Sequence, residues 1–436
     1  MKIVIALLIF SFIIIFHELG HLLLAKKNGI KVVEFSVGLG PTIIGKEFGG
    51  TKYSLKLLPF GGACQMLGEE DMDNTEAGEE GTYYSRSVWQ RMTVILAGPF
   101  FNFILAFILA LFVTGIVGYD PALVTGVTKD TPAYDAGLRA GDTIKKMNHS
   151  NISIGREIDS FFLYNGVSTK PIEVIYERDG EKYETTLYPE KIKKYLLGFT
   201  YNLTDSSVAV EELEKGYPME EAGVEKGDII LEINGHKILS GKELNQFFSA
   251  YPLDGSEVQM LLERNGSEFT VSITPRFISE TYSVGFNYNL YRDKANAGQV
   301  IKYSFVEVKY WIVSTVRNLG MLVTGRLSKD DVGGAVAIVD MIGDSYEETK
   351  ATGSTLDVVL QLMYITILLS ANLGVMNLLP IPALDGGKFL FLIAEAVAGK
   401  PLNRKVEGIV NLAGFVLLML LMVFVFFNDI MRLIGR

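Results

Sequence analysis

The sequence predicts a polytopic α-helical membrane protein with a large water-soluble α+β part. With 49% of its 436 residues hydrophobic and 21% charged, the chain has a mean hydropathy of +0.27, which is too apolar for an ordinary soluble protein. The apolar residues are concentrated in four blocks, and the charges lie between them. The stretch between the second and third blocks reads as soluble sequence in two related copies. These observations together favour membrane helices that flank an inserted soluble region.

The first apolar block is predicted to be a membrane-spanning helix. Residues 3–25 hold 18 apolar residues in 23, and a helix of this length runs about 34 Å, which is enough to cross a bilayer. The alternative is a secretory signal peptide, but its apolar region would be shorter and would end at a small-residue cleavage site. Three further spans are predicted over residues 92–118, 358–379 and 406–427.

The distribution of Lys and Arg predicts the orientation of these spans. Four spans place both termini on one side, and near the span ends nine cations lie on the side of residues 26–91 and 380–405 against five on the other. The excess makes those two loops cytoplasmic. The stretch 119–357 and both termini are then expected outside, in a multi-pass protein of the cell membrane.

Composition also limits the partners and the metal chemistry. The net charge of −10 argues against nucleic acid. The only cysteine, Cys64, excludes an intramolecular disulfide and a multi-cysteine zinc site. A histidine-based metal site must draw on four residues: His17, His21, His149 and His236.

The soluble stretch contains an internal repeat at an offset of 86 residues. The copies match without a gap from residue 132 to 189, for example Pro132 with Pro218, Gly141-Asp142 with Gly227-Asp228, and Arg178 with Arg264. One register over this length indicates a duplicated domain. Each copy is predicted to contain short and longer helices with strands between them, in domains at 119–203 and 204–291.

Both copies resemble PDZ domains in the permuted arrangement of bacteria, through the runs AGLxxGDxI and AGVxxGDxI. The resemblance implies that each domain takes an extended peptide, such as part of a substrate ectodomain, as an added strand on an open sheet edge. The alternative is a pair of spacer domains that bind nothing. His149 and His236 follow strands of the two copies and are expected at the surface.

The run His17-Glu18-Leu19-Gly20-His21 is the most specific signal in the chain. Residues at i and i+4 share one helical face, so His17 and His21 can bind one ion with Glu18 beside them. Ionisable residues inside a span by default indicate a functional site. The alternative is a polar seam that packs against another helix without metal.

Asp385 is the candidate third ligand, because a catalytic zinc takes three protein ligands and one water and the other two histidines belong to the soluble repeats. Pro380 and Pro382 cannot continue the third span, so the chain turns there and re-enters a helix after Gly386-Gly387. Irregular backbone at membrane depth requires protein or a water cavity around it. The alternative is a juxtamembrane turn in which Asp385 caps a helix.

Two flanking segments have their own patterns. Residues 31–66 alternate and carry turn residues, which predicts a β-hairpin that re-enters the membrane from the cytoplasmic side. In the post-repeat segment 292–357, residues 298–324 place aromatic and aliphatic side chains among spaced charges, as in an amphipathic helix on the outer leaflet.

The motifs together resemble the site-2 protease family of intramembrane zinc metalloproteases, most closely the bacterial branch that cleaves anti-sigma factors. The resemblance covers residues 1–118 and 358–436 as well as the repeats, through HELGH, LLPFGGACQMLGEE at 57–70, AGPFFN at 97–102 and NLLPIPALDGG at 377–387. It implies zinc ligands at His17, His21 and Asp385 and a catalytic base at Glu18. It also implies a re-entrant β-loop and substrate-binding roles at four positions: Asn377, Gly61, Gly62 and Asn102.

The expected function is therefore a zinc metalloendopeptidase that cleaves transmembrane segments of single-span proteins within the lipid bilayer. Substrates of the anti-sigma-factor type, and remnant signal peptides, are expected, with the active site toward the cytoplasm and the repeats as a size filter outside. The chain departs from the family at Ala63 and at Gly334-Ala335-Val336-Ala337-Ile338. A non-catalytic PDZ scaffold or a metal transporter is the alternative, but neither needs a base such as Glu18 beside the metal.

Overall fold

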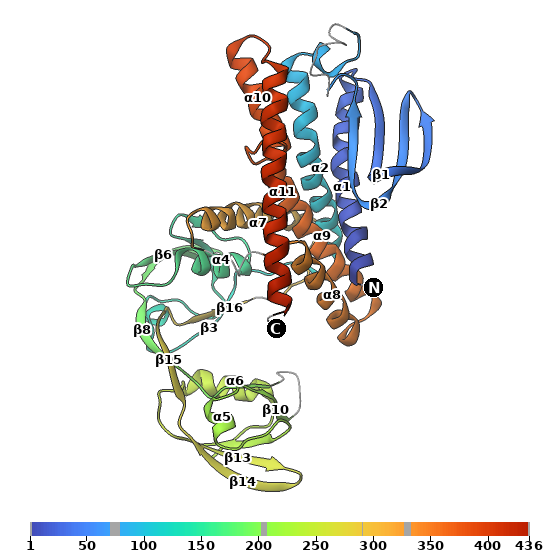
Figure 1. Ribbon diagram of the computed structural model, residues 1–436. Coiled ribbons are helices and arrows are strands. Elements are labelled where there is room, and N and C mark those ends of the chain that lie inside the picture. Colours follow the sequence, from blue (N-terminus) through green and yellow to red (C-terminus); the bar gives the residue numbers. More distant parts are fainter. Residues whose placement is uncertain (1, 70–78, 202–206, 290, 327–332, 435–436) are drawn as a thin grey trace. The chain divides into compact units, whose positions relative to one another are not determined.

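The computed structural model describes residues 2–69, 79–201, 207–289, 291–326 and 333–434, and each structural statement below concerns these residues. The chain forms two compact units (Figure 1). The first combines Met1–Tyr119 with Arg292–Arg436, and the second is Asp120–Tyr291.

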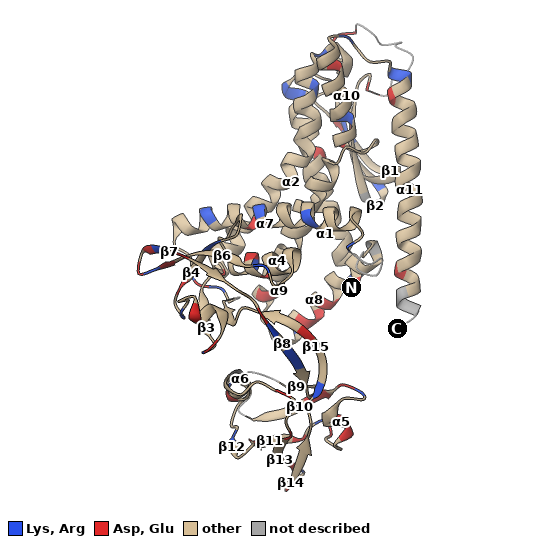
Figure 2. Ribbon diagram, turned by 90° about the vertical axis from the view of Figure 1, so that its left-hand side faces the viewer, with Lys and Arg blue, Asp and Glu red and all other residues tan. Residues whose placement is uncertain are grey.

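The first unit contains the four predicted spans as long apolar helices. These are α1 (Lys2–Lys27), α2 (Val88–Val117), α9 (Thr355–Asn377) and α11 (Arg404–Ile434). All four are long and apolar enough to cross a membrane by length and composition. Figure 2 shows that the charged residues of α11 lie toward its ends. The four predicted spans are confirmed as helices, with ends that differ by a few residues.

Helices α1 and α2 make a backbone-to-backbone contact beside the HELGH motif. A Cβ atom added at Gly20 would lie 2.4 Å from the Ala97 carbonyl oxygen, so only glycine fits there. Helix α2 begins with a capping box in which Ser87 accepts a hydrogen bond from the Gln90 backbone and Gln90 accepts one from Ser87. These contacts fix α2 closely against the histidine face of α1.

A sheet follows α1 where the β-hairpin is predicted. It is formed by β1 (Val32–Phe48) and β2 (Thr51–Met66), which pair antiparallel with several irregularities. Residues 34–37 pair with 52–55 and also with 62–65, so β1 bends and β2 folds back on it. Residues 62–66 have strand partners on one side only within the described chain. The last part of β2 is thus an edge strand.

Three further helices complete the first unit. Helix α7 (Ala297–Val323) matches the amphipathic helix predicted over 298–324, whereas α8 (Ala335–Thr352) is a helix that the sequence pattern did not indicate. The Asp429 side chain on α11 accepts hydrogen bonds from the backbone N–H groups of Gly334 and Val336, at 3.1 Å each. A carboxylate at a helix N-terminus is stabilising. The third helix, α10 (Asp385–Ala398), follows the proline-containing turn after α9.

The second unit contains two copies of one α+β arrangement. The first copy comprises β3 (Val124–Val127), α3 (Pro132–Asp135), β4 (Thr143–Met147), β5 (Ser150–Asn151), α4 (Gly155–Asn165), β6 (Ile172–Arg178) and β7 (Glu181–Leu187). The second comprises β10 (Val208–Leu213), α5 (Pro218–Glu221), β11 (Ile229–Ile233), β12 (His236–Lys237), α6 (Gly241–Ala250), β13 (Val258–Arg264) and β14 (Ser267–Ile273). The same elements recur in the same order, as the repeat predicts.

The two copies exchange their last strands, so their cores do not divide at 203/204. The strand β9 (Phe199–Tyr201) pairs with β10 of the second copy, and β16 (Phe286–Tyr288) pairs with β3 of the first. The hydrophobic cores follow the same exchange, with Phe286 in the first and Leu197 in the second. The connecting strands β8 (Glu190–Leu196) and β15 (Arg276–Ser283) pair with each other. A single boundary at 203/204 therefore does not separate the two domains, because each contains a strand that comes from the other side of that boundary.

The aspartates of the repeated Gly-Asp runs, Asp142 and Asp228, are buried and form partly buried ion pairs with arginines. The Asp228 carboxylate, 1% exposed, accepts hydrogen bonds from Arg264 Nε and Nη2, both at 2.7 Å, and from the Glu225 backbone at 2.8 Å. Asp142 and Arg178 repeat this contact in the first copy. The Arg264 guanidinium holds the pKa of the Asp228 carboxyl below its usual value. This motif is therefore a structural support of each domain.

We expect Asp228→Asn to lower the free energy of unfolding of fragment 120–291 by about 2–3 kcal/mol at pH 7, because Arg264 loses its buried carboxylate partner. A carboxyl whose pKa is lowered in the folded state stabilises the fold above its unfolded pKa, and the stabilisation is lost as pH falls through the folded pKa. The difference between wild type and variant should therefore shrink below about pH 4. Urea denaturation of both proteins at pH 7 and below about pH 4 measures this difference in the free energy of unfolding.

The matched control is Asp179→Asn, which removes the same charge in the turn after β6. The equivalent position of the second copy already carries Asn265, with φ of 53° against 52° at Asp179. The control should unfold like wild type. Equal stability of all three fragments at pH 7 would contradict a structural role for the Asp228 pair.

Candidate metal centre

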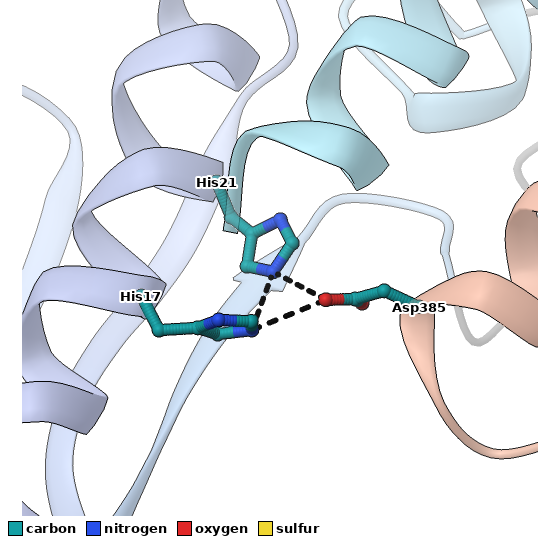
Figure 3. A group of neighbouring side chains, drawn as sticks. All are labelled: His17, His21 and Asp385. Atoms are coloured by element: carbon teal, nitrogen blue, oxygen red, sulfur yellow. Dashed lines mark hydrogen bonds and ion pairs between the residues drawn. The ribbon is translucent and has the colours of Figure 1, made fainter. Parts of the chain in front are cut away.

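Three predicted ligand side chains converge from two separate segments. His17 and His21 lie one turn apart on α1, and Asp385 is the first residue of α10 (Figure 3). The Oδ2 atom of Asp385 lies 3.1 Å from His17 Nε2 and 3.4 Å from His21 Nε2. The two Nε2 atoms are 3.2 Å apart. Residues separated by most of the chain thus present three donor atoms to one point.

The spacing of these three atoms fits a tetrahedral metal ion. Bonds of about 2.0–2.1 Å to nitrogen and oxygen give neighbouring ligand atoms about 3.3 Å apart in a tetrahedron, close to the three distances observed. Asp385 Oδ2 is buried and, apart from the two histidine Nε2 atoms, has no partner in the described part of the chain. A buried carboxylate oxygen without a donor is costly unless a cation neutralises it. The donor set therefore fits zinc.

The turn after α9 holds Asp385 in place through close backbone contacts. A Cβ atom at Gly386 would lie 2.3 Å from the Leu379 carbonyl oxygen, and one at Gly387 would lie 2.3 Å from that of Ile381. Ala383 has φ of +75°, and its N–H donates to Asn411 Oδ1 of α11 at 3.2 Å. The turn between α9 and α10 therefore packs closely against the first residues of α10. The paired glycines of this segment are required by that packing.

The His21 ring is oriented by α2. Its Nδ1 lies 2.9 Å from the Val94 carbonyl oxygen, which accepts the Nδ1 proton and leaves Nε2 free to bind a metal. Gly98 lies directly behind both rings, since an added Cβ atom would be 2.3 Å from His21 Nε2 and 2.7 Å from His17 Nε2. Its only sequence signal is its place in the AGPFFN run.

Two asparagines lie beside the other ring nitrogen of His17. Asn102 Nδ2 is 3.2 Å from His17 Nδ1, and Asn377 Nδ2 is 3.5 Å from it. Asn102 is fully buried at 0% exposure and its Oδ1 has no donor among the described residues. Asn377 instead lines the cavity described next. The two asparagines are therefore placed differently, one behind the ring and one open to a ligand.

A cavity of about 1020 Å³ opens beside the three ligands. Glu18 lines it together with Gly62 and Asn377. A Cβ atom at Gly62 would lie 3.2 Å from Glu18 Cγ, so the edge strand runs directly past this carboxylate. Gly61 faces the Leu39 side chain and not Glu18, because a Cβ atom added at Gly61 would lie 2.8 Å from Leu39. Glu18 and the edge of β2 thus face the same space.

Lys388 is a second residue that the sequence analysis missed. It lies one turn after Asp385 on α10, lines the cavity, and forms an ion pair of 2.6 Å with Glu69. The contact ties α10 to the segment after β2. The remaining histidines, His149 and His236, are exposed in the second unit, as predicted.

The profile of peptidase family M50 matches residues 5–421. The chain is similar to the zinc metalloprotease RasP of Bacillus licheniformis, with 32% identity over 98% of each chain. It is 31% identical to RasP of Geobacillus kaustophilus, over 98% of this chain and 97% of the relative. The regulator of sigma-W protease RasP of Bacillus subtilis is 29% identical over 98% and 97% of the two chains.

Proposed function

This chain belongs to peptidase family M50 and is a site-2-type zinc metalloprotease, and we propose that it cleaves the transmembrane segments of single-span membrane proteins. The observation that carries the proposal is the convergence of His17, His21 and Asp385 beside Glu18, at helices long and apolar enough to span the membrane. A metal transporter or a scaffold would not need Glu18 at the mouth of the cavity.

We assign the metal ligands to His17, His21 and Asp385 and the general base to Glu18. Zinc bound there would supply a water of lowered pKa and a positive charge for the scissile carbonyl. The Glu18 carboxylate faces the same cavity, where it would accept a proton from the attacking water and donate it to the leaving amide nitrogen. The Val94 carbonyl accepts the Nδ1 proton of His21, and Asn102, with its amide turned so that the otherwise unpartnered Oδ1 faces the ring, accepts the Nδ1 proton of His17. Both Nε2 atoms are then free to bind the metal. Asn102 acts here through His17, since its burial keeps it away from a substrate.

A substrate helix must be unwound before its peptide bonds can react. The free edge of residues 62–66 offers backbone hydrogen bonds to an extended peptide beside Glu18. The Asn377 amide lies at the same cavity and contacts the substrate backbone. Ile43, Ile44, Phe48 and Leu57 expose 57–75% of their surface on the sheet, which favours contact of this β-loop with lipid. We propose that it re-enters the membrane from the cytoplasmic side.

The similarity to a regulator of sigma-W protease supports the proposed substrate class. We propose anti-sigma-factor-type substrates, with remnant signal peptides as a further class. The metal centre then lies toward the cytoplasm, and the two repeats are PDZ domains outside the membrane. There they act as a filter that admits only substrates whose outer domain has been removed.

The proposed ligand set is tested by Asp385→Ala. Loss of a ligand should weaken zinc binding by at least the roughly 10- to 100-fold that loss of a supporting residue costs, and cleavage of a purified single-span substrate in detergent should fall with it. Elemental analysis after dialysis against a zinc buffer measures the metal. Asp357→Ala, at the start of α9, is the control and should retain both. One zinc per chain and full activity in Asp385→Ala would remove Asp385 from the site.

The filter is tested by deleting residues 121–290 from the full chain. We expect the deletion protein to cleave a substrate with an intact outer domain at a rate close to that for the truncated substrate. Wild type should prefer the truncated substrate. The truncated substrate also serves as the control for correct folding, because the deletion leaves the metal centre complete. Unchanged preference in a deletion protein that is active would contradict the filter.

A further inference from the structure

A second cavity, of about 380 Å³, lies where two of the candidate spans begin. Its wall includes Val88, the first residue of α2, and Arg404, the first residue of α11. The segment before α2, the end of α10 and the loop from Gly399 to Leu402 also line it. A cavity at the ends of two membrane-spanning helices would lie close to the membrane surface.

The cavity is lined by more cations than carboxylates. Its basic side chains are Arg86, Arg91, Lys400 and Arg404, and its acidic ones are Glu395 and Glu407. Glu395 is already paired with Arg91, which is 4% exposed and donates from Nη1 at 3.1 Å and from Nη2. The charges of Arg91 and Glu395 therefore cancel each other. One carboxylate then remains against three cations.

Two of those cations have no carboxylate partner in the part of the chain that the structure describes. Arg86 donates from Nη2 to the Gly29 carbonyl oxygen at 2.7 Å, and its Nε is buried without an acceptor. Lys400 is exposed at the rim. A buried guanidinium nitrogen without an acceptor is costly unless an anion reaches it. Arg86 and Lys400 both line the cavity, so both charges can act on a ligand bound there.

The surroundings of the cavity suit a ligand with an apolar part. Trp89, next to the wall residue Val88, is 69% exposed, and Val397 near the end of α10 is 84% exposed. Tryptophan at the end of a span is typical of the membrane interface. A free anion would gain nothing from these apolar side chains, whereas a lipid would contact them with its chains.

We propose that this cavity binds the phosphate headgroup of an anionic phospholipid, such as phosphatidylglycerol. Basic pockets between membrane helices are recognised sites for anionic headgroups. Arg86 and Lys400 contact the phosphate, and the acyl chains pass Trp89 and Val397. Inorganic phosphate shares the headgroup chemistry but lacks the chains.

The position of the cavity gives the lipid a structural effect. Tyr84, Arg404 and Glu407 line both this cavity and the one beside the metal centre. The Arg404 guanidinium lies 3.8 Å from the centre of the Tyr84 ring. A headgroup in the second cavity therefore fixes the start of α11, one wall of the space that holds the substrate. The lipid site itself does not depend on the proposed function.

The test uses the full chain, delipidated in detergent and titrated with dioleoyl phosphatidylglycerol, with bound lipid counted by native mass spectrometry. We expect one tightly bound lipid in wild type and about 30-fold weaker binding in the double variant Arg86→Gln/Lys400→Gln. Phosphatidylcholine should bind weakly to both. The matched control is Lys27→Gln/Lys31→Gln, which removes two cations of the same membrane face outside the cavity and should bind like wild type.

Three results would overturn the proposal. One is equal phosphatidylglycerol affinity of the double variant and wild type, and another is an equal loss in the control variant, which would indicate a general surface-charge effect. The third is competition by inorganic phosphate at the concentration of the lipid, which would show that a soluble phosphate is the ligand. If Arg86→Gln prevents folding, the single variant Lys400→Glu serves as the test. Lys400 is exposed, so its substitution should leave the fold intact. It should weaken binding at least fivefold, roughly the contribution of one cation.

Discussion

Glu18→Gln is expected to abolish cleavage of a single-span substrate while leaving the zinc content unchanged. Glu18 faces the cavity beside the three proposed ligands but is not one of them. The amide is almost isosteric with the carboxylate and cannot accept a proton at neutral pH. Loss of general acid–base catalysis costs about 10²- to 10⁴-fold in rate. The measurement is the initial cleavage rate together with elemental analysis of the same sample.

Glu34→Gln is the matched control, because it makes the same change at another carboxylate of the same cavity. Glu34 is already engaged by Ser54 at 2.7 Å and by Lys52 and Lys56 at 3.1 and 3.3 Å, so it is not available as a base. We expect its rate to stay within a few-fold of wild type. Equal rates in Glu18→Gln and wild type would exclude Glu18 as the base, and loss of zinc in that variant would make it a ligand instead.

Gly98→Ala is expected to remove both zinc and activity although the residue has no chemical function. The added methyl carbon would lie 2.3 Å from His21 Nε2, inside the position that the ring needs. Movement of α2 away from α1 would break the hydrogen bond between His21 Nδ1 and the Val94 carbonyl oxygen, which are 2.9 Å apart. The rings must therefore turn, and zinc binding should weaken by at least about 100-fold, the upper cost of disturbing a supporting residue.

The control for this prediction lies on the same helix. A Cβ atom at Gly115 would meet only Val300, at 4.0 Å, so Gly115→Ala has room. Alanine also favours a helix over glycine by about 0.5–1 kcal/mol. Gly115→Ala should bind zinc like wild type and unfold at the same or a higher temperature. Normal zinc content in Gly98→Ala would mean that the histidine rings are not held as described.

The sequence could predict those parts of the molecule that depend on local patterns. The four apolar blocks define helices because their length and composition permit few other structures in a membrane. His17 and His21 could be placed on one face from their spacing alone. Asp385 could be found by elimination, since a chain with two unused, distant histidines leaves a carboxylate as third ligand. The repeat register placed the central strands of each copy, which are β4, β6 and β7 in the first and β11, β13 and β14 in the second.

Other features depend on contacts between segments far apart in the chain. Gly98 has no local signature, because its importance arises from the approach of α1 to α2. The Asn102 side chain was grouped with substrate contacts from its motif, whereas its burial behind His17 is a property of packing. Helix α8 was not predicted, since its start depends on Asp429, 95 residues away from Gly334. The strand exchange is a further example. The repeat alignment shows that β9 and β16 are equivalent, but it does not show that each of them pairs with the other copy.

The strand exchange also sets the order in which the second unit can be assembled during synthesis. In the first copy, β3 pairs as a strand with β16, which is translated after the whole second copy, and its contact with its own copy is limited to the residues around the Leu123–Thr143 bridge in the described chain. The second copy has all of its strands by residue 273. Domains generally fold as units while the chain emerges, so the copy that is made later completes its core first. The N-terminal copy must wait with an open sheet edge, and a truncation anywhere before residue 288 would leave it unfinished.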